Sequence, residues 1–234
     1  TAISVAAGLA ALEKRVLLVD CDPQGNATRG LGHTARAPHL YHVLVGERPI
    51  EAAILPSGFP FLDLLPADRD LVGVEVEFVG LERWEEVLGA RLAAIAERYD
   101  FILIDCPPSL GHLTILALVA ATGVLIPLQC EYFALEGLSE LLSTVRRVTS
   151  ALNPELELVG ILLTMYDDRM KLTRDVEREV REHFPAKVFE AVVPRNVRLA
   201  EAPSHGLSIL QYDIKSRGAE AYLAVARELL RRTR

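Results

Sequence analysis

The sequence contains little cysteine and no long apolar run, and these two absences exclude several classes of protein. Its three cysteines, Cys21, Cys106 and Cys130, are odd in number and lie far apart in 234 residues, so they form neither a disulfide framework nor a metal-binding pair. We expect them to be small, buried apolar residues in a reducing cytoplasm. No apolar run approaches the roughly 20 residues of a membrane-spanning helix, and we expect no segment to cross a bilayer.

The chain also lacks an excess of positive charge. Its formal net charge is −7, whereas proteins that coat nucleic acids by bulk attraction carry an obvious basic excess. The charge is uneven, because residues 195–234 contain eight Lys or Arg and four Asp or Glu, a local net charge of +4 that leaves −11 for the remainder. Any nucleic-acid contact is therefore expected on a local basic face near the C-terminus.

Helical and strand-like segments alternate along the chain. An alanine-rich stretch without proline at residues 2–13 predicts a helix, and the apolar run at 15–20 predicts a buried strand. The pattern recurs, with helices expected at 81–99, 113–121 and 135–152 and strands at 61–65, 101–105, 124–128, 158–164 and 188–193. Strands that are apolar on every residue and separated by helices predict an α/β fold with a doubly wound, mainly parallel sheet and helices on both faces. We expect a single domain over residues 1–234.

Aspartates stand at the ends of two of these predicted strands. Asp20 and Asp22 begin a turn that contains Pro and Gly, and Asp105 ends the strand at 101–105. Ligands of open α/β sheets collect at the carboxyl ends of strands, where a carboxylate can hold Mg²⁺ through water. One such Asp often only stops a strand or caps the next helix. Two strands that both end in acid and a proline-containing turn favour a binding site.

Five motifs, in order along the chain, resemble those of the ParA/Soj partitioning ATPases, the deviant Walker A branch of the MinD/ParA superfamily of P-loop NTPases. The segment DCDPQGNAT at 20–28 is similar to the family's DxDPQGNAT motif, and DCPPS at 105–109 is similar to its Walker B segment. The others are QCEY at 129–132, TMYD at 164–167 and VPRNVRLAEAPS at 193–204. The resemblance spans essentially the whole chain and implies a cytoplasmic, nucleoid-associated ATPase that segregates chromosomal or plasmid DNA.

The resemblance also implies ATP and Mg²⁺ as ligands and gives roles to the residues that match the motifs. Asp22 would position or activate the attacking water, and Asp20 and Asp105 would serve the Mg²⁺ and phosphate shell. The residues expected near the nucleotide base are Thr164, Met165, Pro194, Arg195 and Asn196. For Met165 and Pro194, ordinary packing remains an alternative.

One departure from the family concerns the phosphate-binding loop. Members begin with a strand and a K-G-G-x-G-K-[ST]-T loop that leads into the helix expected at 2–13, and this sequence contains no such loop. Backbone amides and lysines of that loop hold the phosphates, so a polypeptide that lacks it is expected to be inactive as an ATPase. We expect the native protein to carry about 15 to 25 further N-terminal residues, enough for the strand and the loop.

The resemblance links nucleotide state to DNA binding. ATP would join two subunits face to face, and the homodimer would bind double-stranded DNA without sequence preference through paired basic patches. A ParB-type partner would stimulate hydrolysis and release, and we expect it near residues 131–140. The candidate DNA contacts are Arg195, Arg198, Lys215 and Arg217. The alternative interpretation of the basic residues near the C-terminus is a solvated helix face.

Three other interpretations remain open. A MinD-like ATPase that cycles on membranes shares the sheet and the paired acids, but its amphipathic C-terminal helix fits residues 219–234 poorly, because their apolar face suits packing on the domain. We therefore expect no membrane partner. A non-hydrolysing nucleotide- or DNA-binding module would account for an absent loop, but the retained acids argue against it. Nitrogenase-reductase-like proteins hold an iron–sulfur cluster through cysteines whose arrangement this sequence does not match.

Overall fold

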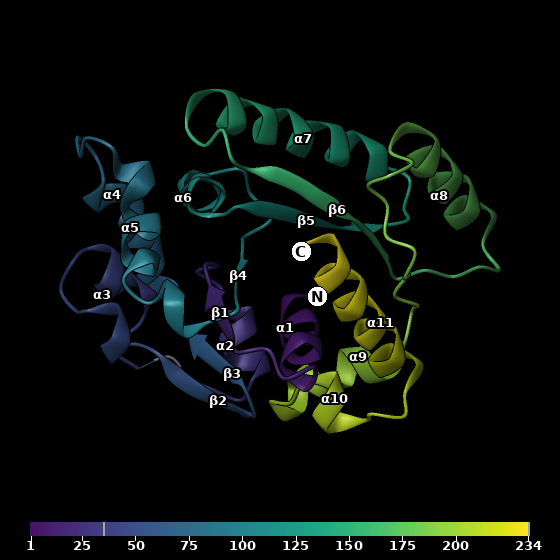
Figure 1. Ribbon diagram of the computed structural model, residues 1–234, viewed down its shortest axis with the longest axis horizontal. Coiled ribbons are helices and arrows are strands. Elements are labelled where there is room, and N and C mark those ends of the chain that lie inside the picture. The colour runs from purple at the N-terminus through teal and green to yellow at the C-terminus, as the bar shows by residue number, and fades with distance from the viewer. Residues whose placement is uncertain (35, 234) are drawn as a thin grey trace.

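The computed structural model describes residues 1–34 and 36–233, and its strands lie between layers of helices (Figure 1). The strands are β1 (Val16–Asp20), β2 (Leu55–Phe59), β3 (Leu62–Leu65), β4 (Phe101–Asp105), β5 (Gly123–Gln129) and β6 (Glu157–Thr164). The α-helices are α1 (Ala2–Ala11), α2 (Asn26–Gly30), α3 (Leu40–Leu44), α4 (Val74–Glu77), α5 (Val87–Ala93), α6 (His112–Ala120), α7 (Ala134–Ala151), α8 (Lys171–His183), α9 (Val197–Glu201), α10 (Ile209–Tyr212) and α11 (Arg217–Arg232). Short 3-10 helices are η1 (Ile50–Ala52), η2 (Arg69–Gly73), η3 (Trp84–Glu86), η4 (Ala96–Arg98) and η5 (Ala202–His205). The predicted α/β class is confirmed.

β1 lies inside a four-stranded sheet with the order β2-β3-β1-β4. β3 and β4 pair with β1 in parallel, and β2 is an antiparallel edge strand. All five residues of β1 are buried, as expected for an apolar strand covered on both faces. β3 confirms the strand predicted at 61–65. The sequence did not predict β2, because its residues LPSGF include Pro and Gly, which strands tolerate mainly at an edge or a bulge.

β5 and β6 form a second, two-stranded parallel sheet. Within residues 1–34 and 36–233, no strand pairing joins β4 to β5, so each of these strands has an open edge. The strand predicted at 188–193 is wrong, since Val188 and Pro194 make only isolated bridges. The backbone N–H groups of Glu190 and Ala191 instead donate to the carboxylate of Glu228 on α11, each over 3.0 Å. That contact diverts the amides that would continue a strand.

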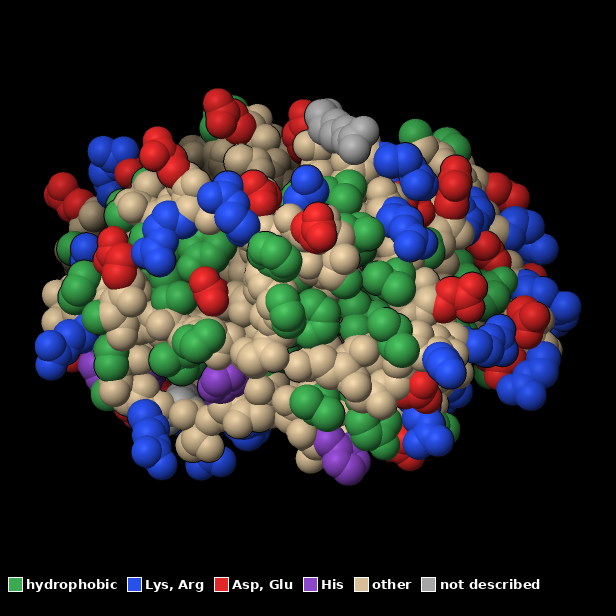
Figure 2. Space-filling view, turned by 60° about the horizontal axis from the view of Figure 1, so that its bottom comes forward, with side chains coloured by type: hydrophobic (Ala, Val, Ile, Leu, Met, Phe, Trp, Pro, Cys, Tyr) green, Lys and Arg blue, Asp and Glu red, His purple; other side chains and the backbone are tan. Residues whose placement is uncertain are grey.

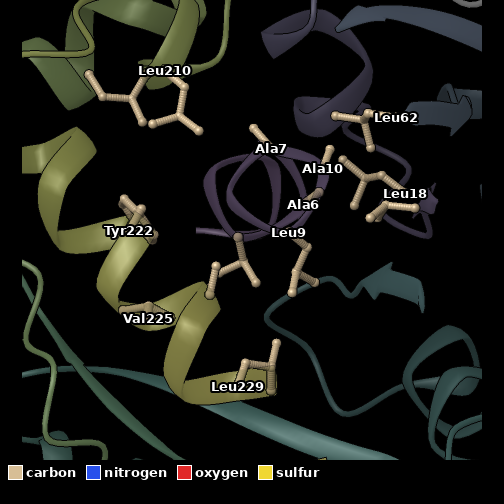
Figure 3. Close-up of a cluster of buried hydrophobic side chains, with 14 of the residues drawn as sticks. Ala6, Ala7, Leu9, Ala10, Leu18, Leu62, Leu210, Tyr222, Val225 and Leu229 are labelled. Atoms are coloured by element: carbon tan, nitrogen blue, oxygen red, sulfur yellow. The ribbon is translucent and has the colours of Figure 1, made fainter. Parts of the chain in front are cut away.

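The first and last helices pack together on one face of the sheet. α1 lies against α11 and against residues of β1 and β3 (Figure 3). A Cβ atom at Gly8 would lie 2.9 Å from Cβ of Ala226, so glycine permits this close approach of the two helices. Tyr222, Val225 and Leu229 are buried in the contact. The prediction that the apolar face of the last helix packs on the domain is therefore confirmed.

The opposite face is covered by α3, α5 and α6, and α7 and α8 pack on the second sheet. Helices on both faces were predicted, but the single helix expected at 81–99 is wrong in extent. It is divided into η3, α5 and η4, because Arg83 takes a left-handed φ of 56° before η3 and Ile95 leaves the helical region before η4. The layers bring the carboxyl ends of β1, β3 and β4 to one edge, where the predicted acids lie.

Candidate functional site

Asp20 and Asp105 stand side by side at the carboxyl edge of the larger sheet. They end β1 and β4, which run parallel, and they are partners in the register of that pair. Asp22 follows in the turn after β1, close enough for its charge to influence the pKa values of both. The structure therefore brings together the three acids that the sequence predicted as one site.

The carboxylate of Asp20 is fully buried and holds the turn that follows β1. Thr28 donates to Oδ2 from both its backbone nitrogen and Oγ1, each over 2.7 Å, and the nitrogen of Asp22 donates to Oδ1 over 3.3 Å. Oγ1 of Thr28 also accepts from the backbone nitrogen of Ala67 over 3.1 Å, which ties this turn to the end of β3. The sequence assigned no role to Thr28, although its place at the end of the DCDPQGNAT segment was the available signal.

The turn around Asp22 has a fixed backbone. The nitrogen of Gln24 donates to Oδ1 of Asp22 over 2.9 Å, and the nitrogen of Gly25 donates to the carbonyl of Asp22 over 2.8 Å. Gly25 has a φ of +61°, and a Cβ atom there would lie 2.8 Å from the carbonyl oxygen of Ala67, so only glycine fits. Asp22 itself is 8% exposed, which places it between the interior and solvent. Its catalytic role stays a prediction.

Burial controls the ionisation of the two paired acids. Desolvation raises the pKa of Asp105 to about 6, and the carboxylates of Asp20 and Asp22 add to this rise. Desolvation also raises the pKa of Asp20, against the lowering effect of the hydrogen bonds from Thr28 and Asp22. In the described part of the chain, no group donates a hydrogen bond to the Asp105 carboxylate. Neighbouring carboxylates with free oxygen atoms are a donor set that fits Mg²⁺.

A second predicted group gathers at the carboxyl end of the smaller sheet. Thr164 ends β6 and is the register partner of Gln129 at the end of β5. Beyond it, the nitrogen of Arg195 donates to the carbonyl of Tyr166 over 3.0 Å, and Tyr166 bridges to Pro194. The structure thus brings the segment at 164–166 beside the segment at 194–196, although contact with a nucleotide stays a prediction.

Two residues of this group have features that bear on their predicted role. Met165 has a φ of 52° and is 39% exposed, so its side chain is not part of the core. Asn196 caps α9, because its Oδ1 accepts from the nitrogen of Arg198 over 2.9 Å. The amide NH₂ of Asn196 remains the group with which this side chain could donate to a ligand.

The four candidate DNA contacts are all exposed, but their charges are not equally available. Arg198 forms ion pairs with Glu201 over 2.9 Å and with Asp213 over 3.6 Å. For the part of the chain that the structure describes, no such pair involves the other three, which are Arg195, Lys215 and Arg217. On the face shown in Figure 2, basic and acidic side chains are interspersed around hydrophobic ones. This face therefore presents no broad positive field to a polyanion.

The cysteines and the lengths of the helices bear on two predictions made from the composition. Cys21 and Cys130 are buried as predicted, whereas the prediction is wrong for Cys106, which is exposed in the turn after β4. Among the described residues, no helix combines the length and the apolar character needed to cross a membrane.

Comparisons with known proteins agree with this arrangement. A family model described as an AAA domain matches residues 1–158. A chromosome partitioning protein ParA from Myxococcus xanthus is 53% identical over 99% of this chain and 83% of the relative, and a chromosome-partitioning ATPase Soj from Thermus thermophilus is 53% identical over 99% and 90%. A crystal structure of cobyrinic acid a,c-diamide synthase from Mycobacterium smegmatis with bound ATP analog and magnesium has a TM-score of 0.86 and 37% identity, over 98% of this chain and 87% of that one. The chain therefore belongs to the ParA/Soj family of chromosome-partitioning ATPases.

Proposed function

We propose that this protein is an ATP-driven switch that partitions DNA in the cytoplasm. ATP joins two copies, the homodimer binds double-stranded DNA on the nucleoid without sequence preference, and hydrolysis stimulated by a ParB-type partner releases it. The observation that carries the proposal is the cluster of Asp20, Asp22 and Asp105 at the carboxyl edge of parallel strands. Support comes from the name of the Thermus relative, a chromosome-partitioning ATPase, and from the ATP analog and magnesium of the similar Mycobacterium structure.

The three acids suit different parts of phosphoryl transfer. Asp105, whose carboxylate receives no hydrogen bond from the described residues, is suited to hold Mg²⁺, which neutralises charge on phosphate oxygens. Asp20 already accepts three hydrogen bonds, so it orders the turn and reaches the metal shell through water. Asp22, at the border of solvent in that turn, positions the attacking water. The phosphates themselves need the loop that the family resemblance implies.

The nucleotide base is proposed to lie against the paired segments at 164–166 and 194–196. Met165 offers an exposed apolar side chain, and the amide of Asn196 offers hydrogen-bond donors. Backbone contacts between the two segments hold them together before any ligand arrives. Two segments that are already held together lower the entropy cost of binding.

Exposed apolar side chains in two segments are available to a face-to-face homodimer. Val76 lies in α4 and Val79 follows that helix, whereas Tyr132 and Phe133 lie between β5 and α7; the four are between 71% and 80% exposed. Large apolar side chains with this exposure are candidates for an interaction surface. A second copy that contacts either segment would cover its apolar side chains. The partner protein is proposed to contact the neighbouring residues 131–140.

Dimerisation would also double the cationic side chains available to DNA. Arg195, Lys215 and Arg217 are the strongest candidates, since Arg198 shares its charge with Glu201 and Asp213. Phosphate contacts add when two patches act together, and each adds to the salt dependence of binding. We therefore expect the ATP-bound dimer, and not the acidic monomer, to bind DNA.

The Asp22→Ala substitution tests the ATPase part of the proposal. In protein that carries the phosphate loop ahead of Thr1, it is expected to keep ATP-dependent dimerisation, measured by light scattering, and to abolish phosphate release. The exposed Asp168 supplies a matched control as Asp168→Ala, which should leave both unchanged. Normal turnover by the Asp22 variant would contradict the assigned role.

A further inference from the structure

A histidine and two aspartates outside the three-aspartate site converge from two segments that are far apart in the sequence. His39 is the residue that begins α3, and Asp68 and Asp70 stand at the start of η2, after β3. Nε2 of His39 lies 3.3 Å from Oδ1 of Asp68 and 3.8 Å from Oδ2 of Asp70. One imidazole nitrogen and two carboxylate oxygens thus all lie within 4.8 Å of one another. Imidazole and carboxylate groups are common ligands of transition-metal ions.

The side chain of His39 is buried at a position where histidine has no evident structural advantage. It is only 2% exposed, and its Nδ1 has no hydrogen-bond partner among the described residues. A buried polar atom without a partner costs free energy of folding. Ser, Thr, Asn and Asp are the residues that best stabilise the first position of a helix. A ligand role for Nε2, which faces the two carboxylates, would account for a histidine at this place.

The two carboxylates are held near His39 and remain within reach of an ion from solvent. Oδ1 of Asp68 accepts a hydrogen bond from the backbone nitrogen of Asp70 over 2.9 Å, which fixes the turn that carries both acids. The side chain of Asp68 is 36% exposed and that of Asp70 is 68% exposed. Within residues 1–34 and 36–233, neither forms an ion pair with Lys or Arg. Their charges are therefore available to a cation.

An ion pair between a protonated His39 and the acids is the alternative interpretation of the cluster. Burial lowers the pKa of His39, although the charge of Asp68 opposes this effect. A neutral imidazole keeps a lone pair on one ring nitrogen, and metal ions bind imidazole in this form. The environment of His39 therefore favours a metal ligand over an ion-pair partner.

The spacing and the donor types together favour zinc. Zn²⁺ binds histidine nitrogen and carboxylate oxygen at about 2.0–2.2 Å in a tetrahedron, which places the ligand atoms roughly 3.3–3.5 Å apart. The separations of 3.3 and 3.8 Å are close to this value, and the exposed side chain of Asp70 can move by the remaining few tenths of an ångström. Mg²⁺ and Ca²⁺ prefer sites made of oxygen alone. Three protein ligands leave the fourth position of the tetrahedron to water.

We propose that His39, Asp68 and Asp70 bind one Zn²⁺ ion, which fastens the start of α3 to the segment after β3. The two segments already touch, because the backbone nitrogen of Leu40 donates to the carbonyl of Pro66 over 2.9 Å. The next residue, Ala67, donates to Oγ1 of Thr28 in the turn that holds Asp20. Bound Zn²⁺ would therefore stiffen a segment that supports the three-aspartate site. The proposal does not depend on the proposed ATPase activity.

Isothermal titration of the metal-free protein with Zn²⁺ tests the site. Mg²⁺ is kept in excess, so that sites made of oxygen alone do not take the probe. The exposed Asp70 can be changed without disturbing the core, and Asp70→Asn is expected to weaken Zn²⁺ binding at least about tenfold. His39→Asn should weaken it likewise, and asparagine suits the first position of α3. Glu47→Gln is the matched control, since the exposed Glu47, like Asp70, acts through its charge on Tyr41, and it should bind Zn²⁺ as the parent does.

X-ray absorption of the zinc-loaded protein identifies the ligands independently of any substitution. We expect one imidazole nitrogen and oxygen ligands at about 2.0–2.2 Å. This ligand set, together with weaker binding by Asp70→Asn and unchanged binding by Glu47→Gln, supports the site even if His39→Asn does not fold. Absence of Zn²⁺ binding, equal binding by Asp70→Asn and the parent, or a sulfur ligand at ~2.3 Å overturns the proposal.

Discussion

The raised pKa of Asp105 predicts that the Asp105→Asn substitution stabilises the fold at neutral pH. Its pKa is about 6 in the folded protein against an ordinary value of 3.8, and a difference of about two units corresponds to about 3 kcal/mol. Partial exposure of the side chain screens the charge, so we expect a gain of about 1–3 kcal/mol in the free energy of unfolding. An amide of the same shape avoids the cost of burying a charge that receives no hydrogen bond from the described residues.

The sign and the pH window follow from proton linkage. The folded state binds a proton at Asp105 more tightly than the unfolded state does, so this group lowers stability as the pH rises from about 4 to about 6. The advantage of the variant should be absent near pH 4, grow through that window and stay constant above it. Urea unfolding followed by circular dichroism at pH 4 to 8 measures the difference, and Asp168→Asn at the surface is the control. A variant that is less stable than the parent at pH 7, or a difference that does not change with pH, would show that the buried charge of Asp105 does not destabilise the fold.

Three further substitutions test the contacts that hold the site and the sheets, each by urea unfolding. Thr28→Val should lower the free energy of unfolding by about 1–3 kcal/mol. The hydroxyl group of Thr28 donates to Asp20 and accepts from the buried backbone amide of Ala67, and valine can form neither hydrogen bond. Glu228→Ala should lose about 3–5 kcal/mol, because it leaves Arg232 and two backbone amides without their buried partner. Gly206→Ala should lose about 2 kcal/mol or more, because it combines a φ of +68° with a Cβ atom 2.5 Å from Cα of Gly32.

Matched variants separate these causes from general damage. Thr28→Ser keeps the hydroxyl group and should keep most of the stability, and Glu228→Gln keeps the shape of the side chain and should lose less than alanine. Gly58→Ala has a similar φ of +83° but meets no atom within 4 Å, so it should show only the left-handed strain of about 1–2 kcal/mol. If Gly58→Ala costs as much as Gly206→Ala, the close approach to Gly32 is not the cause.

The sequence predicted the parts of the fold that depend on local pattern. The strands at 15–20 and 101–105 were recognisable because four consecutive apolar residues precede the acid that ends each of them, and parallel pairing then placed Asp20 beside Asp105. The strand predicted at 188–193 failed because Glu228, about 40 residues further along the chain, captures the amides of Glu190 and Ala191. No local pattern reports a contact of that range.

In the candidate site, too, a local motif predicted which residues matter, whereas contacts between distant segments could not be predicted. The motif at 20–28 located the acids, but the pairing of Thr28 with Ala67 depends on how β3 is placed beside β1. The charge of Arg198 looked available in the sequence, whereas the fold brings Asp213 to within 3.6 Å of it. Which basic residues remain free for DNA could therefore be ranked only from the structure.

The most direct test of the proposed switch is ATP-dependent binding to non-specific duplex DNA at several salt concentrations. It compares the 234-residue chain with the same chain extended by a strand and a phosphate loop ahead of Thr1. We expect the extended protein to bind DNA with ATP, to lose affinity steeply with salt, and to bind more weakly when Arg195, Lys215 and Arg217 are replaced by alanine. Absence of DNA binding by either chain, or equal binding by both without ATP, would contradict it.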